Sequence, residues 1–346
     1  SSAMQYSTTE GYRPLREYIA ARYGKRFNMQ VNPDEIMITN GSQQGLDLLG
    51  KVFLDAGDRV LLERPAYLGA IQAFGVFQPE FQTVLLQEDG ADLEQLRERL
   101  GEAPIKLFYT VSNFQNPSGI SYSPEKRRLV ASILQNYDTV LVEDDPYSEL
   151  CFRGATADPI RKYCEGNAVL LGSFSKIVAP GLRLGWIYAP AVIMEKLVIA
   201  KQGADLHSNY LAQQIVYQFL QDNDLDQHIA TIKQAYQRQR DLMVELLERY
   251  CPAGVNFTRP EGGMFLWLTL PEGISSSELF EEAIKEDVAF VPGQAFYVDG
   301  SGANTLRLNF SNCDETQIEA GINRLAKTIE RFLFKKELEW ETWVGR

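Results

Sequence analysis

A lysine lies between two apolar runs in residues 170–190, LLGSFSKIVAPGLRLGWIYAP. Both runs, AVLLGSF before Lys176 and LRLGWIYA after it, have the composition of buried strands. A buried amine without a partner is costly because its charged form loses its water. Ser173, Ser175 and Arg183 are close by in the sequence, and a guanidinium suits a phosphate. The lysine is therefore either a chance member of a surface loop or an amine kept for covalent chemistry.

Residues 39–45, TNGSQQG, lie between an expected strand and an expected helix. Gly41, Ser42 and Gln43 would present backbone N–H groups at the start of that helix, where the helix dipole favours an anion. No GK[ST] sequence follows, so the segment is not a Walker loop. By itself this pattern favours a plain strand-to-helix turn with Ser42 as the cap.

Two further segments place polar residues after apolar strands. In NFQNPSG, residues 113–119, the Asn116 amide could donate to a ligand oxygen, although Asn-Pro followed by Gly is also an ordinary turn signal. In VEDDPYSEL, residues 142–150, Asp144 and Tyr147 are three residues apart across a proline. That spacing can aim a carboxylate and a phenol at one planar ligand. A carboxylate beside a ring nitrogen raises the pKa of that nitrogen and holds it protonated.

The elements that must hold these residues follow a rhythm of strand, turn and helix. We expect seven strands, at 35–39, 58–63, 81–87, 105–111, 139–145, 168–174 and 182–189, and intervening helices at 42–54, 66–75, 91–100 and 123–137. Continuous apolar strands alternating with helices predict a mostly parallel sheet covered on both faces, with ligands at the carboxyl ends of the strands. Because neighbours along a strand point to opposite faces, we expect Asp144 rather than Asp145 to face a ligand.

The character of the chain changes after the seventh expected strand. Three helical stretches follow, the last of which reaches Tyr250. A second pattern of strands and helices begins at 256–270 and ends in an expected helix at 314–333. We therefore predict a large domain over residues 1–250 and a smaller α+β domain over residues 251–346.

Composition excludes several classes of function. The 346 residues carry a net charge of −12, which argues against a nucleic-acid surface because phosphate binding needs a basic face. The four cysteines and two histidines are scattered, so we expect neither a metal site nor a disulfide framework. No apolar run approaches the ~20 residues that span a bilayer, and no signal peptide opens the chain. We expect a cytoplasmic protein with small-molecule substrates.

Four motifs, in their order and at their intervals, resemble one protein family. They are GSQQGL, NPSG, DDPY and SFSKIVAPGLRLGW, and the stretch MQYSTTEGYRPLRE is typical of one branch. Together they resemble the class I/II aminotransferases of pyridoxal-phosphate fold type I, in the branch of 2-aminoadipate and kynurenine aminotransferases and the catalytic-like domains of MocR-type regulators. The resemblance covers essentially the whole chain. It implies an α/β fold, with a mostly parallel seven-stranded sheet between helices and a smaller α+β C-terminal domain.

The resemblance assigns roles around pyridoxal 5'-phosphate. Lys176 matches the lysine that forms a Schiff base with the cofactor, and Asp144 matches the partner of the pyridine nitrogen. Tyr147 and Asn116 match residues that bond the cofactor's phenolic oxygen, and Arg307 matches the arginine that grips the substrate α-carboxylate. The other matches are a phosphate cradle of Gly41, Ser42, Gln43, Ser173, Ser175 and Arg183, a ring-stacking Tyr67, and Tyr6, which reaches the phosphate of a neighbouring subunit. The last match implies a homodimer with active sites at the subunit interface.

The implied activity is a ping-pong transamination from an L-amino acid to a 2-oxo acid, with 2-oxoglutarate as the expected acceptor. Lys176 would move the proton between the substrate Cα and the cofactor. Two alternatives stay open, because fold does not fix reaction: another fold type I enzyme such as a lyase or decarboxylase, and the effector domain of a MocR-type regulator. The donor also stays open, since aromatic, branched and dicarboxylic substrates all occur in this branch. An upstream arm usually closes over the substrate side chain there, and we find none in these 346 residues.

Overall fold

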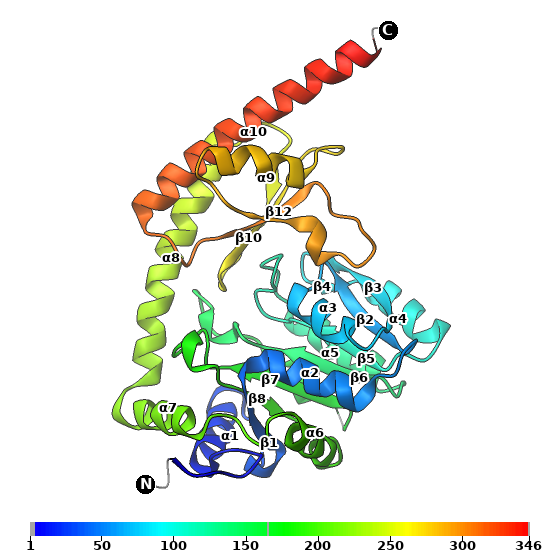
Figure 1. Ribbon diagram of the computed structural model, residues 1–346, viewed down its shortest axis with the longest axis vertical. Coiled ribbons are helices and arrows are strands. Elements are labelled where there is room, and N and C mark those ends of the chain that lie inside the picture. The colour runs from blue at the N-terminus through cyan, green and yellow to red at the C-terminus, as the bar shows by residue number, and fades with distance from the viewer. Residues whose placement is uncertain (1–3, 165, 345–346) are drawn as a thin grey trace.

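The computed structural model describes residues 4–164 and 166–344. Its larger sheet has the strand order β1-β8-β7-β6-β5-β2-β3-β4 (Figure 1). Strands β7, β6, β5, β2 and β3 run parallel to one another, whereas β8 is antiparallel to both of its neighbours. The strands are β1 (Ile36–Thr39), β2 (Arg59–Arg64), β3 (Glu80–Gln87), β4 (Gly90–Ala91), β5 (Leu107–Thr110), β6 (Val140–Asp144), β7 (Ala168–Ser173) and β8 (Gly185–Tyr188).

The short strand β4 makes this an eight-stranded sheet, so the prediction of seven strands is wrong. β4 pairs antiparallel with the end of β3, in a place where the sequence pattern predicted the start of a helix. Helix α4 (Leu93–Glu102) begins later, because the Asp92 carboxylate accepts hydrogen bonds from the backbone N–H groups of Glu94 and Gln95 and caps the helix there. A two-residue strand is too short to show the alternation that a sequence pattern can detect.

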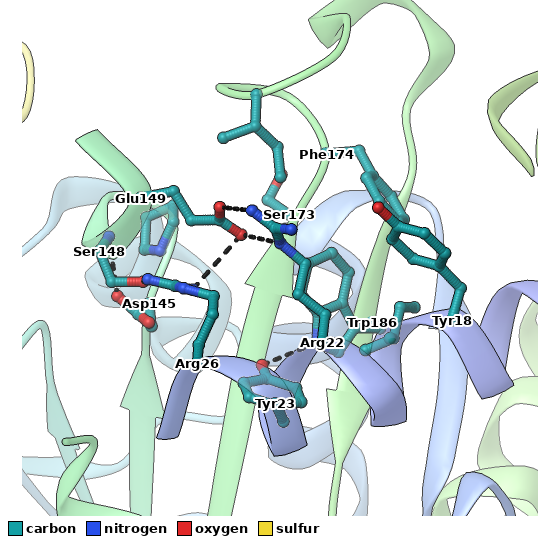
Figure 2. Close-up of a pocket in the computed structure, with 13 residues that line it drawn as sticks. Tyr18, Arg22, Tyr23, Arg26, Asp145, Ser148, Glu149, Ser173, Phe174 and Trp186 are labelled. Carbon is teal, nitrogen blue, oxygen red and sulfur yellow. Dashed lines mark hydrogen bonds and ion pairs between the residues drawn. The ribbon is translucent and has the colours of Figure 1, made fainter. Parts of the chain in front are cut away.

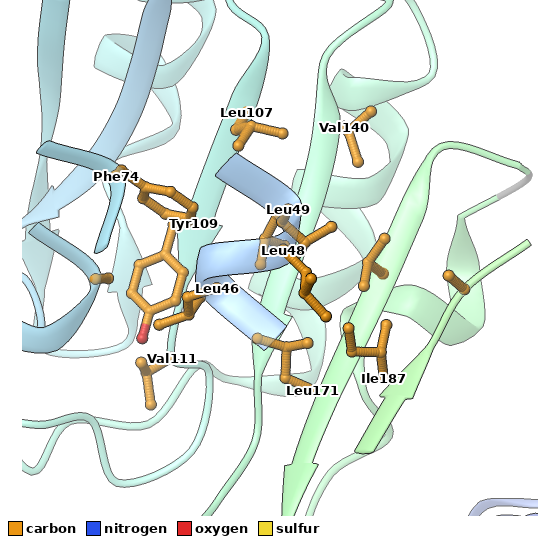
Figure 3. Packing of buried hydrophobic residues seen from close by; sticks show 14 of the residues in the cluster. Leu46, Leu48, Leu49, Phe74, Leu107, Tyr109, Val111, Val140, Leu171 and Ile187 are labelled. Carbon is orange, nitrogen blue, oxygen red and sulfur yellow. The ribbon is translucent and has the colours of Figure 1, made fainter. Parts of the chain in front are cut away.

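Helices cover both faces of the sheet. On one face lie α2 (Gly41–Phe53), α3 (Leu68–Gly75) and α6 (Ala191–Ala204); on the other lie α4, α5 (Pro124–Leu134), α1 (Arg13–Phe27) and α7 (Tyr210–Asp222). The N-cap predicted for α5 is confirmed, since the Ser123 hydroxyl accepts a hydrogen bond from the backbone N–H of Lys126. Figure 3 shows the leucines of α2 packed over Leu171 of β7 and Ile187 of β8. This packing fixes the start of α2 above the carboxyl ends of the central strands.

Alternation along β6 decides which side chains face α2. Val140 and Val142 belong to the core on the α2 side of the sheet, whereas Leu141 belongs to the core on the opposite side. Asp144 continues the even-numbered series and therefore lies on the α2 side. The next residue, Asp145, points to the side covered by α1, where it lines a different pocket.

A second, antiparallel sheet has the order β11-β12-β10-β9 and packs against three helices. Its elements are β9 (Asn256–Phe257), β10 (Phe265–Thr269), β11 (Val291–Pro292) and β12 (Thr305–Asn309), with α8 (Leu225–Tyr250), α9 (Ser276–Lys285) and α10 (Glu315–Val344). Figure 1 shows α8 running from the large sheet to the small one. Although α8 ends at Tyr250, its residues Met243, Leu246 and Leu247 belong to the core of the small sheet. The division between residues 250 and 251 stays a prediction.

Two predicted boundaries are wrong in an instructive way. Strand β8 begins at Gly185 rather than residue 182, because Pro180–Leu182 form a short 3-10 helix and Arg183 adopts a left-handed φ of 52°. Helix α10 continues to Val344 rather than ending at residue 333, since neither glycine nor proline interrupts it there. The first correction turns the segment around Lys176 into a compact loop between two buried antiparallel strands.

Within the described residues, no helix is long and apolar enough to cross a bilayer. The same part of the chain contains no group of three His, Cys, Asp or Glu side chains placed to hold a metal ion. The four cysteines carry free thiols.

Candidate active site

A pocket of about 390 Å³ opens at the carboxyl ends of β6 and β7 and is bounded by the small sheet through Phe265 and Arg307. The structure brings every predicted site residue except Tyr6 to its wall: Gly41, Ser42, Gln43, Tyr67, Asn116, Asp144, Tyr147, Ser173, Ser175, Lys176, Arg183 and Arg307. These residues come from separate parts of the chain. Their convergence makes this pocket the candidate active site.

Tyr6 lies outside this pocket. Its side chain is 84% exposed, and its ring makes an edge contact with the ring of His207. A role for Tyr6 in this pocket of its own chain is therefore not supported. The role implied by the resemblance, contact with the phosphate of a neighbouring subunit, stays a prediction.

Asp144 presents one satisfied and one unsatisfied carboxylate oxygen. Oδ2 accepts a hydrogen bond of 2.9 Å from the Tyr109 hydroxyl, whereas Oδ1 is buried and has no hydrogen-bond partner. The pKa of this carboxyl is raised to about 7, mainly by burial and to a smaller extent by the neighbouring Asp145, while the hydrogen bond from Tyr109 opposes the shift. A buried acceptor without a donor is unfavourable, so Oδ1 is suited to a ligand that brings an N–H group.

Asp145 has a different environment, on the other side of the sheet (Figure 2). Its Oδ1 accepts a 2.9 Å hydrogen bond from the Asn113 amide and a 3.1 Å hydrogen bond from the backbone N–H of Ser148. The two adjacent aspartates are therefore separated as the strand alternation predicted. Asp144 alone of the two lines the candidate site.

Lys176 has no hydrogen bond or ion pair to any described residue. Its pKa is lowered, first by burial and then by the positive charges of Arg183 and Arg307. A lowered pKa increases the fraction of neutral amine at physiological pH, which is the nucleophilic form. Of the two explanations that the sequence allowed, the geometry supports the amine kept for covalent chemistry.

The start of α2 and the Arg183 guanidinium form a region suited to an anion. Helix α2 begins at Gly41, and Asn40 before it gives no side-chain cap to the first turn, in contrast to the capped helices α4 and α5. A Cβ on Gly41 would lie 2.6 Å from Nη2 of Arg183, so a larger residue would push the guanidinium away. The uncapped N–H groups and the cation together favour a phosphate at this end of the pocket.

Arg307 is held by an amide and by aromatic rings rather than by an acid. Its Nη1 donates a 2.7 Å hydrogen bond to Oδ1 of Asn116, and its guanidinium carbon lies 4.2 Å from the ring centroid of Phe265 and 5.3 Å from that of Phe296. Its Nε is buried without a partner, and no carboxylate of the described residues forms an ion pair with it. The guanidinium is therefore orientated by its neighbours and is available to bind an incoming carboxylate.

Other pocket residues were not predicted from the sequence. They are Tyr109, Val111, Pro146, Pro180 and Phe265. Tyr109 was detectable in principle, because β5 pairs with β6 and its carboxyl end must lie near Asp144. Phe265 was not, since nothing in the sequence says which strand of the small sheet faces the large one.

The donors and acceptors of the pocket fit pyridoxal phosphate. The uncapped α2 start with Arg183 suits its phosphate, the unpartnered Oδ1 of Asp144 suits its ring nitrogen, and Lys176 supplies an amine for its aldehyde. Tyr67, which also lines the pocket, offers an aromatic ring for stacking. Each part of the cofactor, its phosphate, its ring and its aldehyde, thus has a suitable group in the pocket wall.

Comparison with known proteins agrees with this site. The family model "Aminotransferase class I and II" matches residues 1–325. The chain is 42% identical over 341 residues to "Aromatic-amino-acid aminotransferase 1" of Thermococcus litoralis, covering 97% of this chain and 82% of that protein. It is 43% identical over 336 residues to "2-aminoadipate transaminase" of Thermus thermophilus, covering 96% and 83%.

A solved structure extends the comparison to the fold. The α-aminoadipate aminotransferase LysN of Thermus thermophilus, complexed with N-(5'-phosphopyridoxyl)-L-leucine, matches with a TM-score of 0.91 and 42% identity, covering 96% of this chain and 84% of that one. The predicted fold type, cofactor and reaction class are thereby confirmed. The chain belongs to the class I and II aminotransferases and is a pyridoxal-phosphate-dependent transaminase that uses an amino acid and a 2-oxo acid.

Proposed function

We propose that the chain transfers the amino group of aromatic amino acids and of 2-aminoadipate to 2-oxoglutarate. The donors are those in the names of two relatives that share more than two fifths of their aligned residues with it. The observation that carries the chemistry is the pocket in which an unpartnered carboxylate oxygen of Asp144, the free amine of Lys176 and a guanidinium of Arg307 without a carboxylate partner converge. Asp144 Oδ1 can accept a hydrogen bond from the cofactor ring, Lys176 can act as a base, and Arg307 can bind the carboxylate of an amino acid.

Pyridoxal phosphate, when bound, supplies an aldehyde that condenses with amines and a ring that accepts electron density from the substrate Cα. We assign to Lys176 Nζ the covalent attachment of the cofactor and, once released, the removal of the proton from the substrate Cα. Its lowered pKa supports the second task, because only a neutral amine can accept a proton. We assign to Asp144 Oδ1 the acceptance of a hydrogen bond from the ring N–H group, which favours the protonated ring.

Binding of the phosphate and of the ring is assigned to the remaining wall of the pocket. Arg183 and the first turn of α2 hold the phosphate by charge and by backbone N–H groups, with the hydroxyls of Ser42, Ser173 and Ser175 close by. Gln43 places its side chain beside the aromatic wall, since its Nε2 donates a 2.7 Å hydrogen bond to the carbonyl of Gly69. Tyr67, Tyr147 and Asn116 are assigned to the ring and its phenolic oxygen.

Arg307 is assigned to the α-carboxylate that donor and acceptor share. A transaminase must hold two substrates in turn, and one guanidinium can bind the carboxylate of each through two parallel hydrogen bonds. The rings of Phe265 and Phe296 stack on the guanidinium and keep it orientated while one substrate leaves and the other binds. The cations of the pocket wall are Lys176, Arg183 and Arg307, and each already has an assigned role. A substrate with a second carboxylate in its side chain, such as 2-aminoadipate, must therefore be recognised there by groups outside this wall.

We propose further that the chain works as a cytoplasmic homodimer. Exposed apolar side chains lie on α6, on α7 and on the link between them, at Val192, Ile199, Leu206, Leu211 and Ile215. A second copy that packed against these elements would remove some of these side chains from water. It would also give the exposed Tyr6 a partner pocket to enter. Light scattering of the purified protein at micromolar concentration should give twice the mass of 39.1 kDa.

A half-reaction screen tests the donor class. The purified protein, loaded with pyridoxal phosphate, is mixed with single amino acids, and the conversion of the cofactor from its aldehyde to its amine form is followed by absorbance. We expect conversion with phenylalanine, tyrosine, tryptophan and 2-aminoadipate, and recovery of the aldehyde form on adding 2-oxoglutarate. Release of ammonia or CO₂ without amine-form cofactor would favour a lyase or decarboxylase. A stable cofactor spectrum with every donor would favour a regulatory effector domain.

A further inference from the structure

A second carboxylate is buried behind the pocket wall and takes no part in the roles assigned above. Glu63, the penultimate residue of β2, is 1% exposed. Its Oε1 accepts hydrogen bonds from the hydroxyls of Thr110 at 2.5 Å and Tyr122 at 2.7 Å. Its Oε2 accepts hydrogen bonds from Nε2 of Gln115 at 2.8 Å and from the backbone N–H of Val111 at 3.3 Å. Four donors, all from residues 110–122, therefore converge on one side chain.

No cation compensates this carboxylate among residues 4–164 and 166–344, in which Glu63 forms no ion pair. Burial raises the pKa of the Glu63 carboxyl to about 7, although its hydrogen bonds oppose the shift. A plain core position would favour an apolar residue, because an ionisable group is expensive to bury. A carboxylate at this position is expected if its directional hydrogen bonds fix the positions of loop segments that apolar packing alone would leave less well defined.

Gln115 connects Glu63 to the pocket. Its Nε2 also donates a 2.7 Å hydrogen bond to the carbonyl of Pro65, and its Oε1 accepts from the backbone N–H of Ser118 at 3.0 Å and from the Ser118 hydroxyl at 2.6 Å. The amide of Gln115 is thus fully used. It ties the loop that carries Asn116, the next residue, to the chain that leads from Glu63 to Tyr67.

Asn116 and Tyr67 lie on the pocket wall at the ends of these two segments. Asn116 accepts the hydrogen bond that orientates Arg307, and Tyr67 is the proposed stacking ring. Neither has a direct hydrogen bond to the other, so their relative position depends on what lies behind them. The group behind both is the pair of Glu63 and Gln115.

We propose that Glu63 is a positioning residue that, through Gln115, sets Asn116 and Tyr67 in register with each other and with the bound cofactor. The inference rests on the proposed roles of Asn116 and Tyr67. A shift of about 1 Å at a distance from the chemistry can lower the rate by about 100-fold, so loss of this hydrogen-bond set should be visible in turnover. Glu63 itself touches neither cofactor nor substrate.

The types of donor around Glu63 predict which substitution is tolerated. Both partners of Oε1 are hydroxyls, which can rotate to accept, whereas both partners of Oε2 are N–H groups, which can only donate. In Glu63→Gln, the new NH₂ group can occupy the Oε1 position and the amide oxygen the Oε2 position. All four hydrogen bonds are then kept with no charge. Glu63→Leu keeps a similar volume and removes all four.

The test compares these two variants with Leu96→Ala, a control for loss of core stability. Leu96 lies on α4 and is fully buried in the core on the side of the sheet away from α2, and it does not line the pocket, so its truncation leaves a cavity outside the pocket wall. We measure the dissociation constant of pyridoxal phosphate by dialysis, the pH midpoint of its bound absorbance, the unfolding temperature of the cofactor-free protein, and kcat and KM. Glu63→Leu should bind cofactor at least ~10-fold more weakly, shift the absorbance midpoint, and lower kcat/KM by ~10- to 100-fold. Glu63→Gln should stay within ~3-fold of wild type.

Three outcomes overturn the proposal. One is a Glu63→Leu protein that resembles Leu96→Ala, with a lower unfolding temperature and unchanged cofactor measurements. Another is a Glu63→Gln protein as impaired as Glu63→Leu. If Glu63→Leu does not fold, Gln115→Leu serves instead, since it removes the connection from a loop; unchanged cofactor binding in that variant counts against the proposal. Asn116→Ala separates a failure of the proposed function from a failure of this inference. If Asn116→Ala leaves cofactor binding and kcat/KM unchanged, the proposed function is contradicted. If Asn116→Ala impairs them and Glu63→Leu does not, only the inference about Glu63 is contradicted.

Discussion

Two pockets meet at the turn after β6, and they differ in how their charges are paired. Both are lined by Pro146 and Ser173. In the pocket of Figure 2, Arg22 donates hydrogen bonds to both oxygens of Glu149, and Arg26 lies 3.3 Å from the same carboxylate. In the candidate active site, by contrast, Asp144 Oδ1, Lys176 and the outer edge of Arg307 have no charged partner among the described residues.

The difference separates a structural cluster from a site. The Figure 2 pocket is slightly more enclosed and its wall is more apolar, but only about 30 Å³ of it is free, against about 390 Å³ in the candidate active site. Its charges tie α1 to the segment after Tyr147 and to Asp226 at the start of α8. The larger pocket keeps its charges unsatisfied, at a cost in stability, and such groups are the ones that a ligand can satisfy. Satisfaction of polar groups, rather than enclosure, identifies the site here.

The largest expected effect comes from Lys176→Ala. We expect turnover to fall by ~10,000-fold, the upper end of what a positioned proton-transfer group contributes. Borohydride reduction of the wild-type protein followed by peptide mapping should place the pyridoxyl label on Lys176, and the variant should bind cofactor only non-covalently. Lys51→Ala, which removes an exposed lysine paired with Asp47 on α2, is the control and should behave as wild type. A label on any other lysine would refute the assignment.

The adjacent aspartates give the second prediction, which tests the two sides of the sheet directly. Asp144→Asn should lower kcat by about 100-fold or more, because a preorganised charge at the reacting group is lost. Asp145→Asn should stay within ~3-fold, since an amide oxygen can still accept from Asn113 and from Ser148. Steady-state kinetics on both variants decide the matter. The reverse order of damage would mean that the two pockets have been assigned the wrong way round.

Arg307→Ala should weaken donor and acceptor alike, by at least ~10-fold in kcat/KM, because a charge-assisted hydrogen bond contributes roughly 1.5–3 kcal/mol. The absorbance of the bound cofactor should change little, as Arg307 is assigned to the substrate. Arg259→Ala is a matched control, because Arg259 pairs with Glu248 and lies outside the pocket wall. If both half-reactions of Arg307→Ala match wild type, the carboxylate is held elsewhere.

Glu149→Gln tests the paired pocket and should affect stability rather than chemistry. The substitution gives the largely buried Arg22 a neutral partner in place of a charged one. Loss of such a charge-assisted hydrogen bond lowers the free energy of unfolding by about 1–3 kcal/mol. Urea unfolding of the cofactor-free protein should show this loss, while kcat stays within ~3-fold of wild type. A drop in kcat as large as that of Asp144→Asn would mean that the charge cluster on α1 controls Tyr147, two residues away.

Most of the large sheet and most of the pocket wall could be predicted from the sequence. Apolar strands alternating with helices determine a parallel sheet, and its carboxyl ends collect the polar segments around Asp144 and Lys176. The role of Arg307 came only from the resemblance, because position along β12 does not reveal which part of the large sheet it faces. Glu63 gave no signal, since an acidic residue at the end of a strand usually meets water.

The pairing of charges also predicts a dependence of stability on pH, the smallest effect considered. Asp144 has an ordinary pKa of 3.8 and a pKa of about 7 in the folded, cofactor-free protein. Between these values the folded state holds a proton that the unfolded state has released, so the contribution of Asp144 to the free energy of unfolding is full below about pH 4 and falls as pH rises towards 7. The slope is at most about 1.4 kcal/mol per pH unit.

Glu63 titrates in the same range, but it is present in both wild type and Asp144→Asn, so its contribution cancels in the difference between their free energies of unfolding. Urea unfolding of these two proteins from about pH 4 to 8 should therefore show a difference that declines up to about pH 7 and is constant above it. Loading with pyridoxal phosphate should remove the decline, because a cation beside Oδ1 keeps the carboxylate ionised. A difference that is flat from about pH 4 to 7 would mean that Asp144 is already ionised in the empty pocket and that its free oxygen carries no penalty for a ligand to relieve.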